Sequence, residues 1–80
     1  MTGVAPVVRL SGDVARQFAH LPVEQAVEAV ATHLSRFWEP RMLRDLVSRV
    51  QADEPGIDPL VGRTVRERLA ADPGPTDRRA

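Results

Sequence analysis

The sequence contains no cysteine, and this absence removes several kinds of chemistry at once. Without thiols the chain can form no disulfide, can offer no thiolate to zinc or to an iron–sulfur cluster, and can perform no thiol redox reaction. Its two histidines, His20 and His33, lie far apart in the sequence, with no metal-ligand pattern around them. A chain of 80 residues is close to the lower size limit for independent folding, so it depends on its own packing or on a partner.

An excess of one charge and long apolar runs are also missing. The 11 basic residues balance the 11 acidic ones, which argues against a surface that neutralises nucleic-acid phosphates. No apolar run approaches the ~20 residues that span a bilayer, and the first ten residues are too weakly apolar for a signal peptide. We therefore expect no nucleic-acid partner, no membrane insertion and a cytoplasmic location.

Interior prolines punctuate the chain at positions where helices could begin. Proline is tolerated in the first helical turn because its missing N–H would be unpaired there anyway. Four of them, Pro6, Pro22, Pro40 and Pro59, each precede a stretch with helical periodicity. The sequence therefore predicts an all-α fold, a small bundle of three to four short helices.

The apolar residues of the first two predicted helices recur at steps of three and four. In residues 6–19 the stripe consists of Val7, Leu10, Val14, Phe18 and the following Leu21. In residues 22–37 it consists of Val23, Val27, Val30, Leu34 and Phe37. Each stripe is expected to face a common core.

The last two predicted helices have shorter stripes and more charge. Residues 40–52 carry Leu43, Leu46, Val47 and Val50. The last helix starts at Pro59, with Asp58 as its N-cap, and carries Leu60, Val61, Val65 and Leu69. Ion pairs are expected within a ladder of Arg41, Asp45 and Arg49, and between Arg63 and Glu67.

The last ten residues, 71–80, differ in composition from the rest. The stretch ADPGPTDRRA contains two prolines and almost nothing to bury, which predicts disorder. We therefore expect one helical domain over residues 1–70 and a disordered tail over residues 71–80.

Two of the three aromatic residues are adjacent, at the corner between the second and third predicted helices. Neighbouring side chains at a helix end point about 100° apart, so one can fill the core while the other faces elsewhere. Phe37 continues the apolar stripe and is expected to pack in the core, whereas Trp38 fits either a corner core or a partner contact. The flanking arginines fit either solvated helix ends or a binding surface, since Trp and Arg are enriched in binding hot spots. The predicted partner-binding residues are Arg36, Phe37, Trp38, Pro40, Arg41 and Met42.

Catalytic equipment is not apparent. His33 and Ser35 are two positions apart on a helix and point to different faces. Glu39 and Asp45 are not spaced to act together, and no Gly-rich phosphate loop occurs. We predict no catalytic, cofactor-binding or metal-binding residue in this chain.

Two motifs carry a family resemblance. One is H-L-x-x-F-W-x-P-R-M at residues 33–42 and the other is G-x-D-P-L-V at residues 56–61. With the sequence between and around them, residues 20–69 resemble the delta subunit of bacterial soluble NAD-dependent formate dehydrogenases, which contain molybdenum or tungsten. Glu39 departs from the family pattern, which commonly has Asp there, and Glu is a poorer N-cap.

The resemblance implies a role in a larger enzyme. The alpha subunit of that family carries bis-molybdopterin guanine dinucleotide and iron–sulfur clusters and oxidises formate. Beta and gamma subunits pass electrons to NAD through FMN and further clusters. The delta subunit has no cofactor, and it docks on alpha to support assembly, stability or insertion of the molybdenum cofactor.

Two other functions remain open at this point. One is a transient assembly chaperone of the same enzyme, which would need the same exposed apolar surface. The other is a small helical DNA-binding protein. The loop over residues 52–57 argues against a helix-turn-helix, because it is longer than the usual turn of about 3–4 residues and contains proline.

Overall fold

The computed structural model describes residues 5–69, most of which are helical. The elements are α1 (Pro6–Phe18), α2 (Val23–Phe37), α3 (Pro40–Gln51), α4 (Pro59–Thr64) and a π-helical turn, η1 (Val65–Leu69), that continues α4. No strand occurs in residues 5–69, so the predicted all-α class is confirmed. The tail predicted to be disordered, residues 71–80, lies outside the described residues.

The prolines begin the helices as the sequence predicts. Pro6, Pro40 and Pro59 each lie in the first two positions of a helix, and Pro22 is the N-cap of α2. Side-chain capping is confined to α4, where an Asp58 carboxylate oxygen accepts a hydrogen bond from the Leu60 backbone N–H at 2.8 Å. Proline geometry rather than capping therefore starts the three longer helices.

The cap on α4 gives a direct test of this helix start. Asp58→Ala should lower the free energy of unfolding by about 1 kcal/mol, because the Leu60 N–H loses its acceptor. Urea denaturation followed by circular dichroism measures the loss. Asp58→Ser keeps a capping oxygen and should retain most of the stability. An equal loss in both variants would mean that capping is not what Asp58 contributes.

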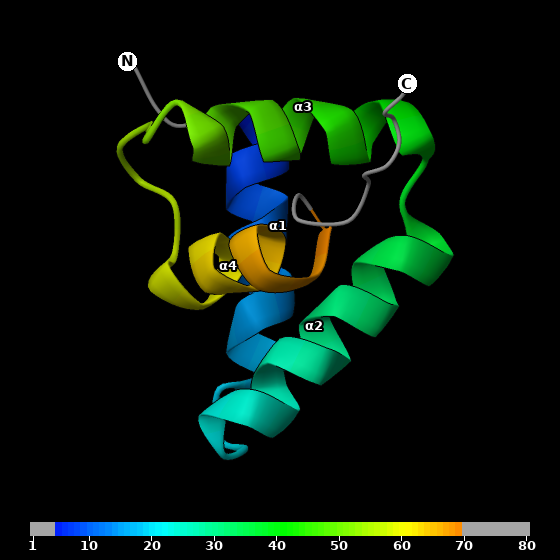
Figure 1. The fold of residues 1–80 in the computed structure, drawn as a ribbon, viewed down its shortest axis with the longest axis vertical. Coiled ribbons are helices and arrows are strands. Elements are labelled where there is room, and N and C mark those ends of the chain that lie inside the picture. Colours follow the sequence, from blue (N-terminus) through cyan, green and yellow to red (C-terminus); the bar gives the residue numbers. More distant parts are fainter. Residues whose placement is uncertain (1–4, 70–80) are drawn as a thin grey trace, which may run out of the picture.

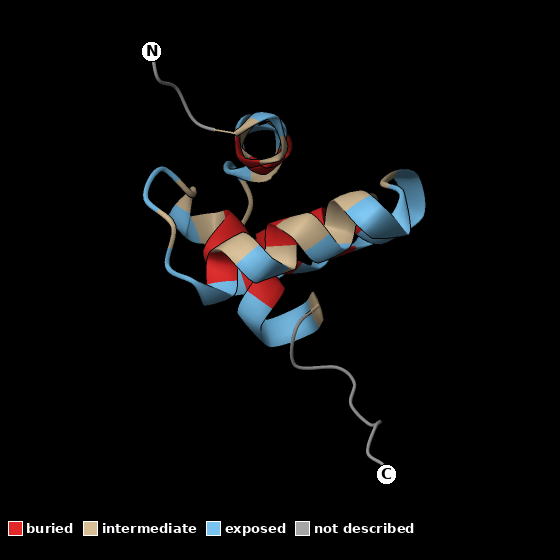
Figure 2. Ribbon diagram, turned by 90° about the horizontal axis from the view of Figure 1, so that it is seen from above, coloured by how far each residue is buried: buried red, intermediate tan, exposed pale blue. Residues whose placement is uncertain are grey.

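The helices cross rather than run parallel (Figure 1). α1 follows the long axis and is seen end-on from above, while α3 lies across one end of it (Figures 1 and 2). α2 packs on α1 and α4, and α3 packs on η1 and α1. The buried positions of the helices gather on their facing sides (Figure 2).

The core combines residues from every helix. Its buried members are Val14 and Ala15 of α1, Val30 and Leu34 of α2, Leu46 and Val50 of α3, Val61 of α4, and Val65 of η1. These residues come from segments that are far apart in the sequence and meet only in the folded chain. No single helix therefore buries its apolar face alone.

Three residues of the predicted stripes are exposed and lie outside this core. Leu10 is 42% exposed, Val23 is 48% exposed, and Phe37 at the end of α2 is also exposed. On α1, the side of the helix that faces the other helices instead carries Val8 and Ser11, which are both fully buried. The Ser11 hydroxyl donates to the Val8 carbonyl at 2.8 Å, and this bond allows a polar side chain to be buried there.

Ion pairs form between charged side chains on the outer surface of the helices. Arg63 pairs with Glu67 at 2.9 Å and Arg49 with Asp45 at 2.9 Å, as predicted. The other step of the predicted ladder, from Arg41 to Asp45, does not form an ion pair. Arg49 also reaches Glu54 at 2.8 Å, which ties the end of α3 to the loop that follows. Hydrogen bonds from Arg49 to Glu54 and then to Asp45 raise the pKa of the Arg49 guanidinium.

Candidate functional site

The corner between α2 and α3 is built from two extended residues. Trp38 ends α2 with φ −94° and ψ 143°, and its N–H still donates to the Leu34 carbonyl at 3.1 Å. Glu39 is the extended N-cap of α3, and Pro40 follows it in the first turn. Proline disfavours a helical conformation at the residue before it, so the chain leaves α2 and starts α3 within two residues.

The two corner aromatics differ in burial. Phe37 is 70% exposed, so the prediction that it packs in the core is wrong. Trp38 is half-buried and packs against the core cluster. The extended backbone at Trp38 turns its indole inward, whereas Phe37 lies on the last turn of α2, beyond the part of the helix that the core covers.

Phe37 belongs to a row of three rings on α1 and α2. The ring centroids of Phe37 and His33 are 4.9 Å apart, with 46° between the planes. His33 in turn meets Phe18 of α1 edge-on, at 6.4 Å and 61°. Sequence reasoning missed this row, although the spacing of four between His33 and Phe37 was a signal for one shared helix face.

The other predicted docking residues do not form one patch. Arg36 lies on α2 and lines a hollow against η1 together with Arg68. Pro40 and Arg41 are exposed at the start of α3, and Met42 is half-buried. The corner therefore presents an aromatic side at the end of α2 and an arginine-bearing side at the start of α3.

Three of the five arginines in residues 5–69 that make no ion pair with the described residues lie at or near this corner; the other two are Arg9 and Arg66. Ion pairs within residues 5–69 engage Arg16, Arg49, Arg63 and Arg68. Arg36, Arg41 and Arg44 make no ion pair with the described residues. Arg41 and Arg44 share a shallow hollow with Pro40 and with one carboxylate, Glu39. Zero net charge for the whole chain thus coexists with a local positive excess.

A second surface feature, the α3 groove, adjoins the corner at Pro40. It has a volume of about 480 Å³ and is lined by Pro40, Leu43, Arg44, Val47, Ser48 and Gln51 of α3 and by Leu69 of η1. Sequence reasoning missed it because one wall comes from a residue far along the chain, and helical periodicity carries no information on which helices meet.

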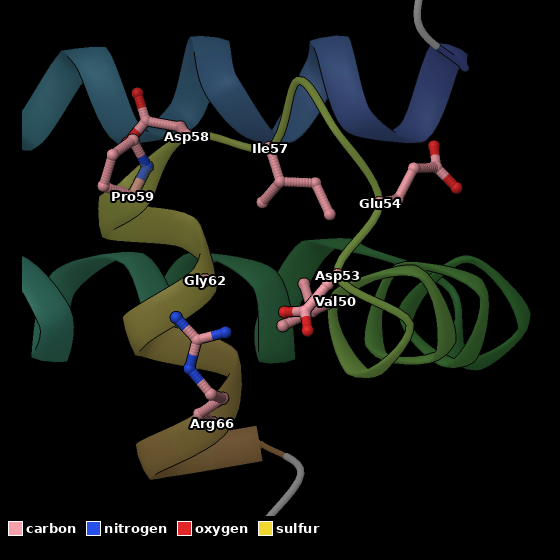
Figure 3. A pocket seen from close by; sticks show the side chains of 8 residues that line it. All are labelled: Val50, Asp53, Glu54, Ile57, Asp58, Pro59, Gly62 and Arg66. Atoms are coloured by element: carbon pink, nitrogen blue, oxygen red, sulfur yellow. The ribbon is translucent and has the colours of Figure 1, made fainter.

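A smaller hollow lies between the end of α3, the following loop and α4 (Figure 3). Its volume is about 170 Å³, below the roughly 300–1,000 Å³ typical of ligand pockets. Its lining includes Asp53, Glu54 and Asp58, and Arg66 folds back over Gly62. Glu54 and Asp58 are already engaged by Arg49 and by the α4 cap. Two of its three carboxylates are thus used by local contacts, and the hollow is small for a ligand.

Two further observations concern the described residues as a whole. Within residues 5–69, no three His, Cys, Asp or Glu side chains gather in a way that could hold a metal ion. Over the same range, none of the helices combines the length and apolarity needed to cross a membrane.

Comparison with known proteins identifies the family. Neither a search of curated proteins nor a search of solved structures gave a match. Residues 6–65 match the family described as NADH-dependent formate dehydrogenase delta subunit FdsD. The matched segment contains α1 to α4, the α2–α3 corner and most of the α3 groove. Because this segment is most of the chain, the protein belongs to that family and is a delta subunit of an NAD-dependent formate dehydrogenase.

Proposed function

We propose that this delta subunit is non-catalytic and works by docking on the catalytic alpha subunit through the α2–α3 corner. The single observation that supports this best is Phe37, a large apolar side chain that is 70% exposed. Such a side chain gains the most from burial against another protein, and aromatic residues are enriched in binding hot spots. It stands on the end of a rigid helix, so docking orders little new structure.

The charge of the corner indicates the character of the docked surface. Arg41 is exposed and has no ion pair with the described residues. An acidic alpha-subunit surface beside an apolar depression would match Arg41 and Phe37 together. The planar guanidinium of Arg41 can donate two parallel hydrogen bonds to one carboxylate. Such a pair fixes the orientation of the two proteins as well as attracting them.

Docking alone accounts for a role in the enzyme. A subunit that binds only the folded form of alpha stabilises it by mass action, since binding removes folded alpha from the unfolding equilibrium. The molybdenum or tungsten cofactor, the iron–sulfur clusters and FMN belong to the partner subunits. The delta chain has no cysteine, and so has no thiolate to offer a cluster. By the same mass action, delta would stabilise the folded alpha subunit while the molybdenum or tungsten cofactor is inserted.

The test is co-purification of delta with alpha, beta and gamma from cells that produce all four. Phe37→Ala and Arg41→Ala should each weaken retention of delta by about tenfold, because each removes a contact at the centre of the docking surface. Both side chains are exposed, so circular dichroism should show native helicity in the free variants.

Two matched variants control for apolar and charged truncation. Val23→Ala shortens an exposed apolar side chain at the other end of α2, and Arg9→Ala removes an exposed arginine from α1. Both should be retained like the wild type. Normal retention of Phe37→Ala and Arg41→Ala would refute docking through the corner. A wild-type chain that is absent from the active enzyme but needed for its assembly would instead identify a transient chaperone.

A further inference from the structure

The α3 groove contains apolar surface that the fold covers only in part. The α3 stripe has four members, of which Leu46 and Val50 are fully buried. Leu43 and Val47, four residues apart on the neighbouring helix face, are only half-buried and line the groove. The half-buried Leu69 forms the opposite wall. The apolar stripe of α3 is thus wider than the contact that η1 and α1 make with it.

The shape of the groove suits a helix. Its lining residues start at Pro40, recur along one face of α3 and end at Gln51, which corresponds to a rise of about 16 Å. A second helix laid along α3 would cover that length with about three turns. Helix-in-groove recognition uses anchors at such i, i+3, i+4 and i+7 positions.

The groove also has a defined charge. Arg44 lines it, is exposed, and makes no ion pair with the described residues. Its neighbours Ser48 and Gln51 are polar and uncharged, and no carboxylate lines the groove. The acidic residue of α3, Asp45, is held by Arg49. An occupant would therefore need to bring its own carboxylate.

Two local candidates for the occupant of the groove fail to supply both apolar anchors and a carboxylate. Residues 70–80 contain alanine and proline but no larger apolar side chain that could fill the groove. A second copy of the chain would present the same face in a two-fold contact, and that face has no carboxylate for Arg44. Neither candidate supplies both the apolar anchors and the charge.

We infer that the α3 groove binds an amphipathic helix of another subunit of the formate dehydrogenase, with apolar anchors toward Leu43 and Val47 and a carboxylate beside Arg44. This inference rests on the proposed docking of delta and adds a second contact next to the corner. Pro40 lies in both surfaces, so one partner can cover the corner and the groove together.

A crosslinking experiment on the four-subunit enzyme identifies the occupant. The photo-reactive residue p-benzoylphenylalanine replaces Ser48, which is exposed and lines the groove. After irradiation, mass spectrometry should find an adduct on a peptide of another subunit that carries apolar residues at helical spacing and an Asp or Glu. The same probe in place of the exposed Gln17 on α1 should give no such adduct. An adduct on the delta tail, on a second delta chain or on no peptide would overturn the inference.

Charge reversal tests the carboxylate. Arg44→Glu should weaken retention of delta about tenfold and reduce its salt dependence, while Arg9→Glu on α1 should behave like the wild type. Both residues are exposed, so neither variant should lose helicity. Equal retention of the two variants would refute the contact at Arg44.

The outcomes separate this inference from the proposed function. If the corner variants detach while Arg44→Glu is retained and Ser48 gives no adduct, docking at the corner stands and the groove inference fails. If wild-type delta is not retained at all, both fail.

Discussion

Leu34→Ala is expected to lower the free energy of unfolding by about 3 kcal/mol or more. Leu34 is completely buried and belongs to the cluster that joins all the helices. Truncation leaves a cavity that the crossing helices cannot close without moving relative to one another.

The loss is large relative to what a chain of this length has. Domains are stable by about 0.05–0.15 kcal/mol per residue, so about 3 kcal/mol removes a quarter to three quarters of the total. The melting temperature should fall by more than about 10 °C, or the cooperative transition should disappear. Thermal unfolding followed by circular dichroism at 222 nm measures this.

Leu10→Ala is the matched control for Leu34→Ala. The same atoms are removed from a side chain that is 42% exposed, and the loss should stay below about 1 kcal/mol. Similar losses at Leu34 and Leu10 would contradict the assignment of the core to the inner side of α2.

Trp38→Ala should cost about 2–3 kcal/mol, whereas Phe37→Ala should cost no more than about 1 kcal/mol. The indole of Trp38 packs on the core at the corner, and its removal leaves the junction of α2 and α3 uncovered. Phe37 loses mainly its contact with His33. Urea unfolding of the two variants, measured side by side, gives the difference.

The pair also separates stability from binding. Phe37→Ala should keep the fold and lose retention in the enzyme, while Trp38→Ala should lose stability first. A larger loss of stability for Phe37→Ala than for Trp38→Ala would show that the phenyl ring, not the indole, closes the corner. In that case the exposed aromatic surface proposed for docking would not exist.

Local chemistry explains which parts of the fold could be predicted from sequence. Helix starts at Pro6, Pro40 and Pro59 were predictable because proline restricts its own backbone and that of its neighbour. The N-cap at Asp58 and the pair of Arg63 with Glu67 involve residues within four positions of each other. Such features do not depend on the rest of the molecule.

Features set by contacts between helices were not predictable in the same way. Periodicity places Leu10 and Phe37 on apolar stripes, but it does not say where along a stripe the neighbouring helix ends. Both side chains are exposed because nothing in residues 5–69 covers them. The fourth helix was predicted to continue regularly to Leu69, yet η1 has π geometry from Val65 onward.

The candidate site was predicted in part. The sequence indicated the corner and its six residues, because paired aromatics flanked by arginines stand out in a chain with 4% aromatic residues. It could not indicate the α3 groove, where Leu69 of η1 faces Leu43 and Val47 of α3. Those side chains are neighbours only after α4 has folded back under α3.

The position of Phe37 beyond the covered part of α2 has an evolutionary consequence. A residue that contributes little to folding can change without a stabilising substitution elsewhere, so it is free to follow changes in a partner. Leu34, one turn earlier on the same helix, has no such freedom. On the proposed docking at the corner, selection for a folded chain gives way to selection for fit to the partner within a single turn of α2.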